Sequence, residues 1–442
     1  MPMHGAMPNS FDPTRVDALE PRARELVTRR RRLLGPGYKL FYEQPIEVVR
    51  GEGVHLFDAD GNAYLDAYNN VPCVGHCHPH VVEAITRQAG TLNSNTRYLA
   101  EPLLDYAERL LATHHDGLGS IMLACSGSEA TDLALRIARH ASGAKGVVVT
   151  ANAYHGVTAA AAEVSPSLGA NEPLGVHVRT VLPPGPGETD PVAAGDAFAL
   201  RVEEAIADLH RHGTATAAVL MDTLLSSDGL VPDPPGFLRP VVDAAHAAGA
   251  LFIADEVQAG FGRTGAAMWG YQRHGIEPDL VTMGKPMGNG VPISGVAARP
   301  ELLERFGNEV RYFNTFGANS IAVAAATAVL DVIERDDLVA QVGDVGEHLR
   351  SGLAGLAREH PALRNVRGAG LYVAADLVDP ATGAPDAQAT SRVVNGLRER
   401  RVLISAAGAA ASALKVRPPL PFGHDHADQL LAALADVLAD AC

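Results

Sequence analysis

Cysteines and long apolar runs are both scarce in this 442-residue sequence. Its four cysteines (Cys73, Cys77, Cys125 and Cys442) are too few for a disulfide framework in a chain of this length. The most apolar stretch, 321–330, is about half as long as a membrane span. The N-terminus also lacks the basic and then apolar pattern of a signal peptide. We therefore expect a soluble, cytoplasmic protein without a membrane partner.

Basic residues are fewer than acidic residues in this sequence. The chain has 36 lysines and arginines against 51 aspartates and glutamates, which gives a net charge of −15. Nucleic acids favour clustered basic residues, so this balance argues against a nucleic-acid partner. The one basic run, Arg29 to Arg32, is interpreted as a solvated helix face that ends at the turn 35–37. Hydrophobic residues make up 47% of the chain, which excludes global disorder.

Short apolar runs alternate with helical patterns in the central part of the chain. The runs lie at 146–150, 218–222, 251–255 and 280–284. β-Branched runs separated by helices are typical of a mainly parallel sheet that is buried on both faces. The sequence therefore predicts an α/β fold.

The pattern differs at both ends of the chain. Residues 54–67 predict a hairpin, and the C-terminal third predicts a strand at 370–378 and a final helix at 426–440. We expect three parts, which are a flexible leader at 1–30, a large α/β domain at 75–325, and a small α+β domain built from 31–74 together with 326–442.

The segment 125–139 carries the first candidate site. Ser126, Gly127 and Ser128 precede a stretch whose apolar positions follow helical spacing. Small residues at a helix start leave N–H groups free to hold an anion, although the same residues also fit an ordinary N-cap. Because the helix dipole contributes only about 0.3–1 kcal/mol, an anion site here needs further donors from elsewhere in the chain.

Two further candidates lie where apolar runs end. Asp255 ends the run 251–255, where a carboxylate can hold a protonated ring nitrogen or a metal. The alternative is a helix cap or a surface acid. Lys285 follows the run 280–284, where burial lowers the pKa of a lysine and makes it nucleophilic; the alternative is a surface lysine in a turn. An anion cradle, an acid and a lysine together match pyridoxal phosphate, which has a phosphate, a ring nitrogen and an aldehyde that bonds to lysine.

From about residue 30 to the C-terminus, the chain resembles a class III aminotransferase of the fold-type-I pyridoxal-phosphate enzymes. The motifs that carry this resemblance are VGHCHP (74–79), SGSEATDLALR (126–136), AYHG (153–156), FIADEVQAGFGRTG (252–265), the Lys285 segment and NTFGAN (314–319). The resemblance implies a large domain with a mainly parallel sheet of the seven-stranded type and a smaller α+β domain.

The resemblance also implies roles for individual residues. Lys285 would form the Schiff base with the cofactor, and Asp255 would pair with its ring nitrogen. Further contacts to the cofactor are implied for Ser126, Gly127, Ser128, Tyr154, His155, Gln258 and Thr315. Thr315 would reach the phosphate in the neighbouring subunit, which implies a homodimer.

One branch of the family resembles the chain more closely. The stretches LDAYNNVPCVGHCHP, LNSNTRYL, VTMGKPMGNG and YFNTFG are similar to the ethanolamine-phosphate phospho-lyase group. Ser227 also stands where ordinary transaminases have a gating glutamate, and Lys415 where they have a carboxylate-binding arginine.

The leading hypothesis is therefore elimination of phosphate from a small primary amine such as ethanolamine phosphate, giving an aldehyde, ammonia and phosphate. Candidates for holding the substrate phosphate are Arg97, Lys415 and Arg417. The alternative is an ω-amino-acid or amine transaminase with a keto-acid acceptor, and a third hypothesis is a non-catalytic protein that has kept the fold.

A metal site is the last class considered. The stretch 73–80 contains two cysteines and three histidines. Structural zinc sites need four ligands, typically with paired spacings, and this stretch also matches the family motif. We expect no metal.

Overall fold

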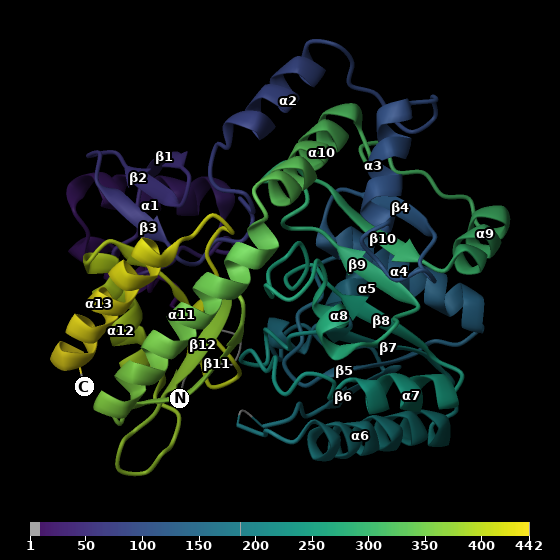
Figure 1. The fold of residues 1–442 in the computed structure, drawn as a ribbon. Coiled ribbons are helices and arrows are strands. Elements are labelled where there is room, and N and C mark those ends of the chain that lie inside the picture. The colour runs from purple at the N-terminus through teal and green to yellow at the C-terminus, as the bar shows by residue number, and fades with distance from the viewer. Residues whose placement is uncertain (1–8, 186, 442) are drawn as a thin grey trace.

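The computed structural model describes residues 9–185 and 187–441, and the largest sheet of the protein has seven strands (Figure 1). The strand order is β4-β10-β9-β8-β7-β5-β6. These strands are β4 (Ser120–Ala124), β5 (Gly146–Thr150), β6 (Val178–Val181), β7 (Thr216–Asp222), β8 (Leu251–Asp255), β9 (Leu280–Met283) and β10 (Ser294–Ala298). All neighbours are parallel except β10, which is antiparallel to both β4 and β9. The predicted α/β fold with a mainly parallel sheet is confirmed.

Helices cover both faces of this sheet. Two hydrophobic clusters lie on opposite faces of the sheet. One contains Val147 and Val149 of β5 with residues of α4, and the other contains Val148 with residues of α6 and α7. Successive strand residues therefore pack in opposite layers, as expected for a sheet buried on both sides. The helices of this part are α4 (Gly127–Ser142), α5 (Ala159–Ala162), the short 3-10 helix η2 (Pro166–Leu168), α6 (Pro191–Arg211), α7 (Arg239–Ala247), α8 (Gly270–His274) and α9 (Pro300–Glu309).

Two four-stranded sheets form the other part of the molecule, to the left in Figure 1. Their strand orders are β1-β2-β3-β13 and β11-β12-β15-β14. The strands are β1 (Val48–Glu52), β2 (His55–Asp58), β3 (Ala63–Asp66), β11 (Leu363–Ala369), β12 (Tyr372–Leu377), β13 (Val402–Leu403), β14 (Ser405–Ala407) and β15 (Ala413–Val416). The hairpin predicted from sequence is the antiparallel pair β2 and β3. Because β13 pairs in parallel with β3, segments from both ends of the chain share one sheet.

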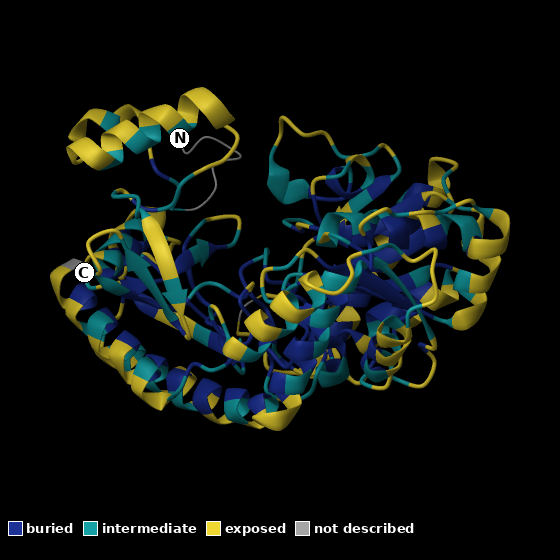
Figure 2. Ribbon diagram, turned by 90° about the horizontal axis from the view of Figure 1, so that it is seen from above, coloured by how far each residue is buried: buried dark blue, intermediate teal, exposed yellow. Residues whose placement is uncertain are grey.

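The remaining helices connect and cover these sheets. They are α2 (Pro79–Ala89), α3 (Glu101–Leu111), α10 (Ser320–Arg335), α11 (Leu338–Glu359), α12 (Ala387–Glu399) and α13 (His424–Ala441). Helix α10 packs against α2 and α3, and α13 packs against α11 and α12. Figure 2 shows that the buried residues gather inside both parts, whereas the outer helices have exposed faces. Among the described residues, no helix combines the length and apolarity that crossing a membrane requires.

The N-terminal segment contains helical structure. A 3-10 helix, η1 (Pro13–Ala18), precedes α1 (Pro21–Leu34), which has no buried residue and ends before Gly35. The basic run Arg29 to Arg32 therefore lies on an exposed helix, as predicted. The expected leader at 1–30 contains η1 and most of α1, and residues 1–8 of it lie outside the described residues. The division into domains at 75–325 and at 31–74 with 326–442 remains a proposal.

Candidate active site

Three chemically active side chains meet at the carboxyl edge of the large sheet. Asp222 ends β7, Asp255 ends β8, and Lys285 follows β9, and these strands are neighbours in the order β9-β8-β7. Asp222 and Asp255 are direct register partners. All three side chains line one cavity of about 150 Å³. The carboxyl edge of a parallel sheet is where ligands bind in open α/β folds, so this cavity is the candidate active site.

The N-terminus of α4 forms one wall of the cavity. Gly127 and Ser128 line it, while Ser126 is the N-cap residue, whose Oγ accepts a hydrogen bond from the Glu129 N–H at 3.2 Å. A Cβ atom at Gly127 would lie 2.9 Å from a methyl carbon of Val257, so the wall leaves no room for a side chain there. The first N–H groups of a helix have no intrahelical acceptor, and the helix dipole favours an anion beside them. This cradle fits a phosphate.

Asp255 is paired with a buried histidine. Its Oδ2 lies 2.6 Å from His155 Nδ1, and its Oδ1 accepts hydrogen bonds from the Val257 N–H at 3.0 Å and the Thr282 hydroxyl at 3.3 Å. His155 Nε2 is buried without a partner. Asp255 is thus a buried acceptor that is held in a fixed position at the cavity, where a carboxylate suits a protonated ring nitrogen. Tyr154 also lines the cavity, and burial raises the pKa of its hydroxyl.

Lys285 is partly accessible where it lines the cavity. Burial and the nearby charge of Arg417 lower the pKa of its amine to about 8, while the charge of Asp255 opposes this effect. An amine with a lowered pKa is a better nucleophile at neutral pH. The donor set of this cavity therefore fits a cofactor that presents a phosphate, a ring nitrogen and an aldehyde.

Two buried cations lie next to this cavity. Lys415 is on β15 and Arg417 follows it, and both lie over the ring of Tyr372, with Lys415 Nζ at 5.4 Å and Arg417 Cζ at 5.6 Å from its centroid. Arg417 also donates a hydrogen bond to Gln258, which lines the cavity. Burial, and then the charge of Arg417, lowers the pKa of Lys415 to about 7. Within residues 9–185 and 187–441, neither cation forms an ion pair with a carboxylate, so the pair is suited to hold an anionic ligand.

Other residues from the sequence predictions lie outside the cavity lining. Ser126 is the N-cap of α4, which was the alternative interpretation of that residue. Thr315 is exposed. The guanidinium of Arg97 lies over the ring of Phe313, 4.0 Å from its centroid. None of these three residues lines the cavity of this single chain, and their proposed roles stay predictions.

Sequence reasoning missed two carboxylates, of which only Asp222 lines the cavity. Asp222 lines the cavity, and burial and the charge of Asp255 raise its pKa. Asp228 accepts hydrogen bonds from the Thr150 hydroxyl at 2.6 Å and the Asn152 N–H at 2.8 Å, and burial raises its pKa to about 6. Asp222 ends an apolar run just as Asp255 does, so the same signal could have identified it.

The histidines of the stretch 73–80 have partners within the protein. His76 Nε2 lies 2.7 Å from a carboxylate oxygen of Asp66, and His80 Nε2 lies 2.9 Å from one of Asp331. In the part of the chain that the structure describes, no three His, Cys, Asp or Glu side chains form a group that could hold a metal ion.

Comparison with known proteins gives closely related sequences and folds. Residues 41–438 match the family Aminotransferase class-III. A Caenorhabditis elegans protein named ethanolamine-phosphate phospho-lyase homolog 1 is 37% identical over 435 residues, which cover 94% of this chain and 93% of that protein. A Drosophila melanogaster protein named alanine–glyoxylate aminotransferase 2-like is 37% identical over 428 residues, with 94% and 87% covered. The solved structure of a phospholyase from Arthrobacter in complex with phosphoethanolamine has a TM-score of 0.91 and 44% identity, and covers 94% of this chain and 99% of that chain.

Proposed function

Because this chain belongs to the class III aminotransferase family of pyridoxal-phosphate enzymes, we propose that it eliminates phosphate from a small amino-phosphate such as ethanolamine phosphate. The observation that carries this proposal is the pair Lys415 and Arg417, two buried cations without a carboxylate partner beside Lys285. Buried cations without a carboxylate partner are costly, so a site that keeps two of them is suited to bind an anionic group. The similarity to a phospholyase crystallised with phosphoethanolamine supports the same substrate class.

The side chains of the site have distinct tasks in this proposal. When bound, pyridoxal phosphate supplies an electron sink next to the substrate amine. Gly127 and Ser128 hold the cofactor phosphate at the start of α4, and Asp255 keeps a proton on the ring nitrogen, held in place by His155. Lys285 Nζ removes a proton from the carbon that bears the amine, because its lowered pKa makes it an effective base near neutral pH. Lys415 and Arg417 hold the substrate phosphate.

The decisive experiment is incubation of the purified holoenzyme with ethanolamine phosphate in the absence of any keto acid. We expect release of inorganic phosphate, ammonia and an aldehyde in equal amounts. Lys285→Ala should abolish this release, whereas Lys145→Ala, at an exposed lysine, should leave it unchanged. If no phosphate appears while the amino group is transferred to pyruvate or 2-oxoglutarate, the enzyme is an amine or ω-amino-acid transaminase instead.

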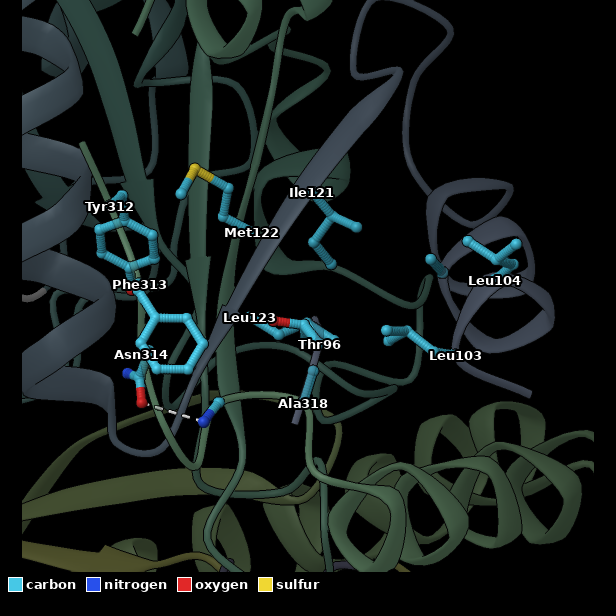
Figure 3. A pocket seen from close by; sticks show the side chains of 12 residues that line it. Thr96, Leu103, Leu104, Ile121, Met122, Leu123, Tyr312, Phe313, Asn314 and Ala318 are labelled. Carbon is cyan, nitrogen blue, oxygen red and sulfur yellow. Dashed lines mark hydrogen bonds between the residues drawn. The ribbon is translucent and has the colours of Figure 1, made fainter. Parts of the chain in front are cut away.

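We also propose that the chain forms a homodimer in which Thr315 reaches the cofactor phosphate of the neighbouring subunit. An apolar pocket of about 300 Å³ lies between α3, β4 and residues 312–318, the segment that contains Thr315 (Figure 3). Leu104 at its edge is 58% exposed, and the nearby Phe316 is 69% exposed. Exposed apolar surface of this kind favours contact with another protein surface.

The assembly is tested by sedimentation, where a dimer has twice the chain mass of 46.2 kDa. Phe316→Asp should shift the protein toward the monomer, and Thr315→Val should raise the dissociation constant of the cofactor without changing the mass. A monomeric wild-type protein with full cofactor affinity would contradict this proposal.

A cytoplasmic location is proposed as well. Cys73, Cys77 and Cys125 are free cysteines, as expected for a protein of a reducing compartment. Fractionation of cells that express the tagged protein tests this location.

A further inference from the structure

Lys415 has an unusual setting among the lysines of this protein. The chain has four lysines, Lys39, Lys145, Lys285 and Lys415. The first two are exposed, whereas Lys285 lines the cavity and Lys415 is only 9% exposed. The ammonium group of Lys415 faces the ring of Tyr372 at 5.4 Å, and no hydrogen bond or ion pair to another described residue holds it. An ammonium group without a fixed partner is free to interact with a ligand.

Charged and titratable residues from several elements lie near Lys415. Arg417 lies on the same chain segment, Tyr372 comes from β12, Tyr68 from the loop after β3, and Asp222 from the end of β7. Burial and Arg417 lower the pKa of Lys415, and Asp222 and Tyr68 oppose this effect, which leaves it at about 7. A phosphate bound beside Lys415 would raise the pKa again, because an anion stabilises the charged amine. Lys415 would therefore carry a proton when the phosphate is in place.

Resting on the proposed elimination reaction, we propose that Lys415 is the general acid that protonates the ester oxygen of the departing phosphate. Arg417 is the fixed cation that holds the phosphate next to it. Arginine keeps its proton under all physiological conditions, whereas a buried lysine can give its proton away. The lysine at position 415 therefore adds a proton donor that an arginine could not provide.

The elimination needs such a donor. The bond between the substrate carbon and the ester oxygen breaks, and its electron pair stays on the oxygen. The phosphate ester is a dianion, and the electron pair of the broken bond adds a third negative charge to the departing phosphate. Without a proton this trianion is a strong base and therefore a poor leaving group. Transfer of the Lys415 proton to the ester oxygen lets hydrogen phosphate depart and leaves Lys415 as a neutral amine. Lys285 takes the proton from the neighbouring carbon, whose electron pair ends in the new carbon–carbon double bond, and Lys415 regains its proton from water.

The test compares Lys415→Arg with wild type on two substrates. Ethanolamine phosphate needs a proton on its leaving group, whereas 2-aminoethyl sulfate releases sulfate, a weak base that leaves without one. We expect Lys415→Arg to lower kcat for phosphate release by about 10²–10⁴-fold, the usual range for loss of a general acid, and to change KM much less. Sulfate release should fall by less than about tenfold, which is the size of a loss confined to binding contacts. Lys145→Arg, at an exposed lysine, is the matched control and should behave as wild type.

A second measurement is independent of turnover. Calorimetric titration of the holoenzyme with inorganic phosphate at pH 8, in buffers of different ionisation enthalpy, reports protons taken up on binding. Wild type should take up a proton as Lys415 becomes charged, and Lys415→Arg should not. Lys415→Gln, which lacks both the charge and the proton, provides the same comparison if the arginine variant does not fold.

The outcomes separate this inference from the proposed function. Equal losses on the two substrates, or unchanged proton uptake in Lys415→Arg, would overturn the general-acid role and leave the elimination reaction standing. If wild type releases neither phosphate nor sulfate, the proposed function itself is wrong, and the role of Lys415 with it.

Discussion

Asp222 of β7 and Asp255 of β8 lie opposite each other in register, so two carboxylates stand side by side at the edge of the large sheet. They differ in their partners. Asp255 faces His155 at 2.6 Å, whereas Asp222 accepts hydrogen bonds from Ser226 and from the Leu224 N–H at 2.9 Å. Burial, and then the nearby charge of Asp255, raises the pKa of Asp222. In the proposed function Asp255 serves the ring nitrogen, while the charge of Asp222 acts on the two lysines.

The charge of Asp222 raises the pKa of both Lys285 and Lys415. Asp222→Asn removes that charge, so each lysine loses its proton at lower pH. Because Lys415 must carry its proton to act as the acid, we expect the alkaline limb of the pH profile of kcat/KM for phosphate release to move to lower pH, with about a tenfold loss at pH 8 for a shift of one pKa unit. Asp196→Asn, on the exposed side of α6, is the control. An unmoved alkaline limb would show that the charge of Asp222 does not act on Lys415.

The pair His155 and Asp255 predicts an effect on cofactor affinity. His155→Ala leaves Asp255 Oδ2 without its partner in a buried site. Hydrogen bonds to charged groups contribute about 1.5–3 kcal/mol, so the cofactor dissociation constant should rise by about 10- to 100-fold. Equilibrium dialysis against pyridoxal phosphate measures this change. His212→Ala, at an exposed histidine, should bind the cofactor as wild type does. Equal cofactor affinity of the His155 and His212 variants would contradict the prediction.

Much of this site could be predicted from the sequence because its residues end apolar runs. Asp255 ends one run that forms a strand and Lys285 follows another, and parallel strands bring their carboxyl ends to one edge. The N-terminus of α4 was predicted from the apolar spacing after Ser128, and that helix begins at Gly127.

Other features have no local signal in the sequence. The reversed direction of β10 depends on its pairing with β4 and β9, and its sequence SGVAA contains nothing that fixes a direction. The stacking of Lys415 and Arg417 on Tyr372 joins β15 to β12, and only the folded sheet brings these residues together. Arg97 and Thr315 lie outside the cavity lining. The predicted contact of Thr315 is with a neighbouring subunit, so one chain alone does not test it.

Glu256 predicts a pH dependence of stability. Its carboxylate is fully buried and accepts hydrogen bonds from the Thr223 hydroxyl at 2.7 Å and the Gly270 N–H at 2.8 Å, yet burial raises its pKa to about 7. The folded state thus binds the proton more tightly than the unfolded state. The contribution of this pKa shift to the free energy of unfolding is up to about 3 kcal/mol. It is fully present below about pH 4.5 and is lost as the pH rises to about 7.

Glu256→Gln cannot titrate, so it isolates this contribution. The free energy of unfolding of wild type minus that of the variant should decrease as the pH rises from 5 to 8. Urea unfolding of both holoenzymes at several pH values measures the difference. A difference that stays constant across this range would mean that Glu256 is ionised in the folded protein even at low pH.

Arg367 connects the small sheet β11-β12 to the loop that follows Asp222. Its guanidinium donates hydrogen bonds to the carbonyl oxygens of Gly229 and Leu230, each at 2.6 Å, and pairs with Asp376 at 2.7 Å. Arg367→Met would leave these acceptors without a donor, and loss of one partner of a buried ion pair costs about 3–5 kcal/mol. We expect that decrease in the free energy of unfolding by urea denaturation. Arg364→Met removes an exposed arginine of the same strand and should change stability by less than about 0.5 kcal/mol. If both variants have the same free energy of unfolding, the hydrogen bonds of Arg367 add nothing measurable to stability. Other contacts would then hold the loop against the small sheet.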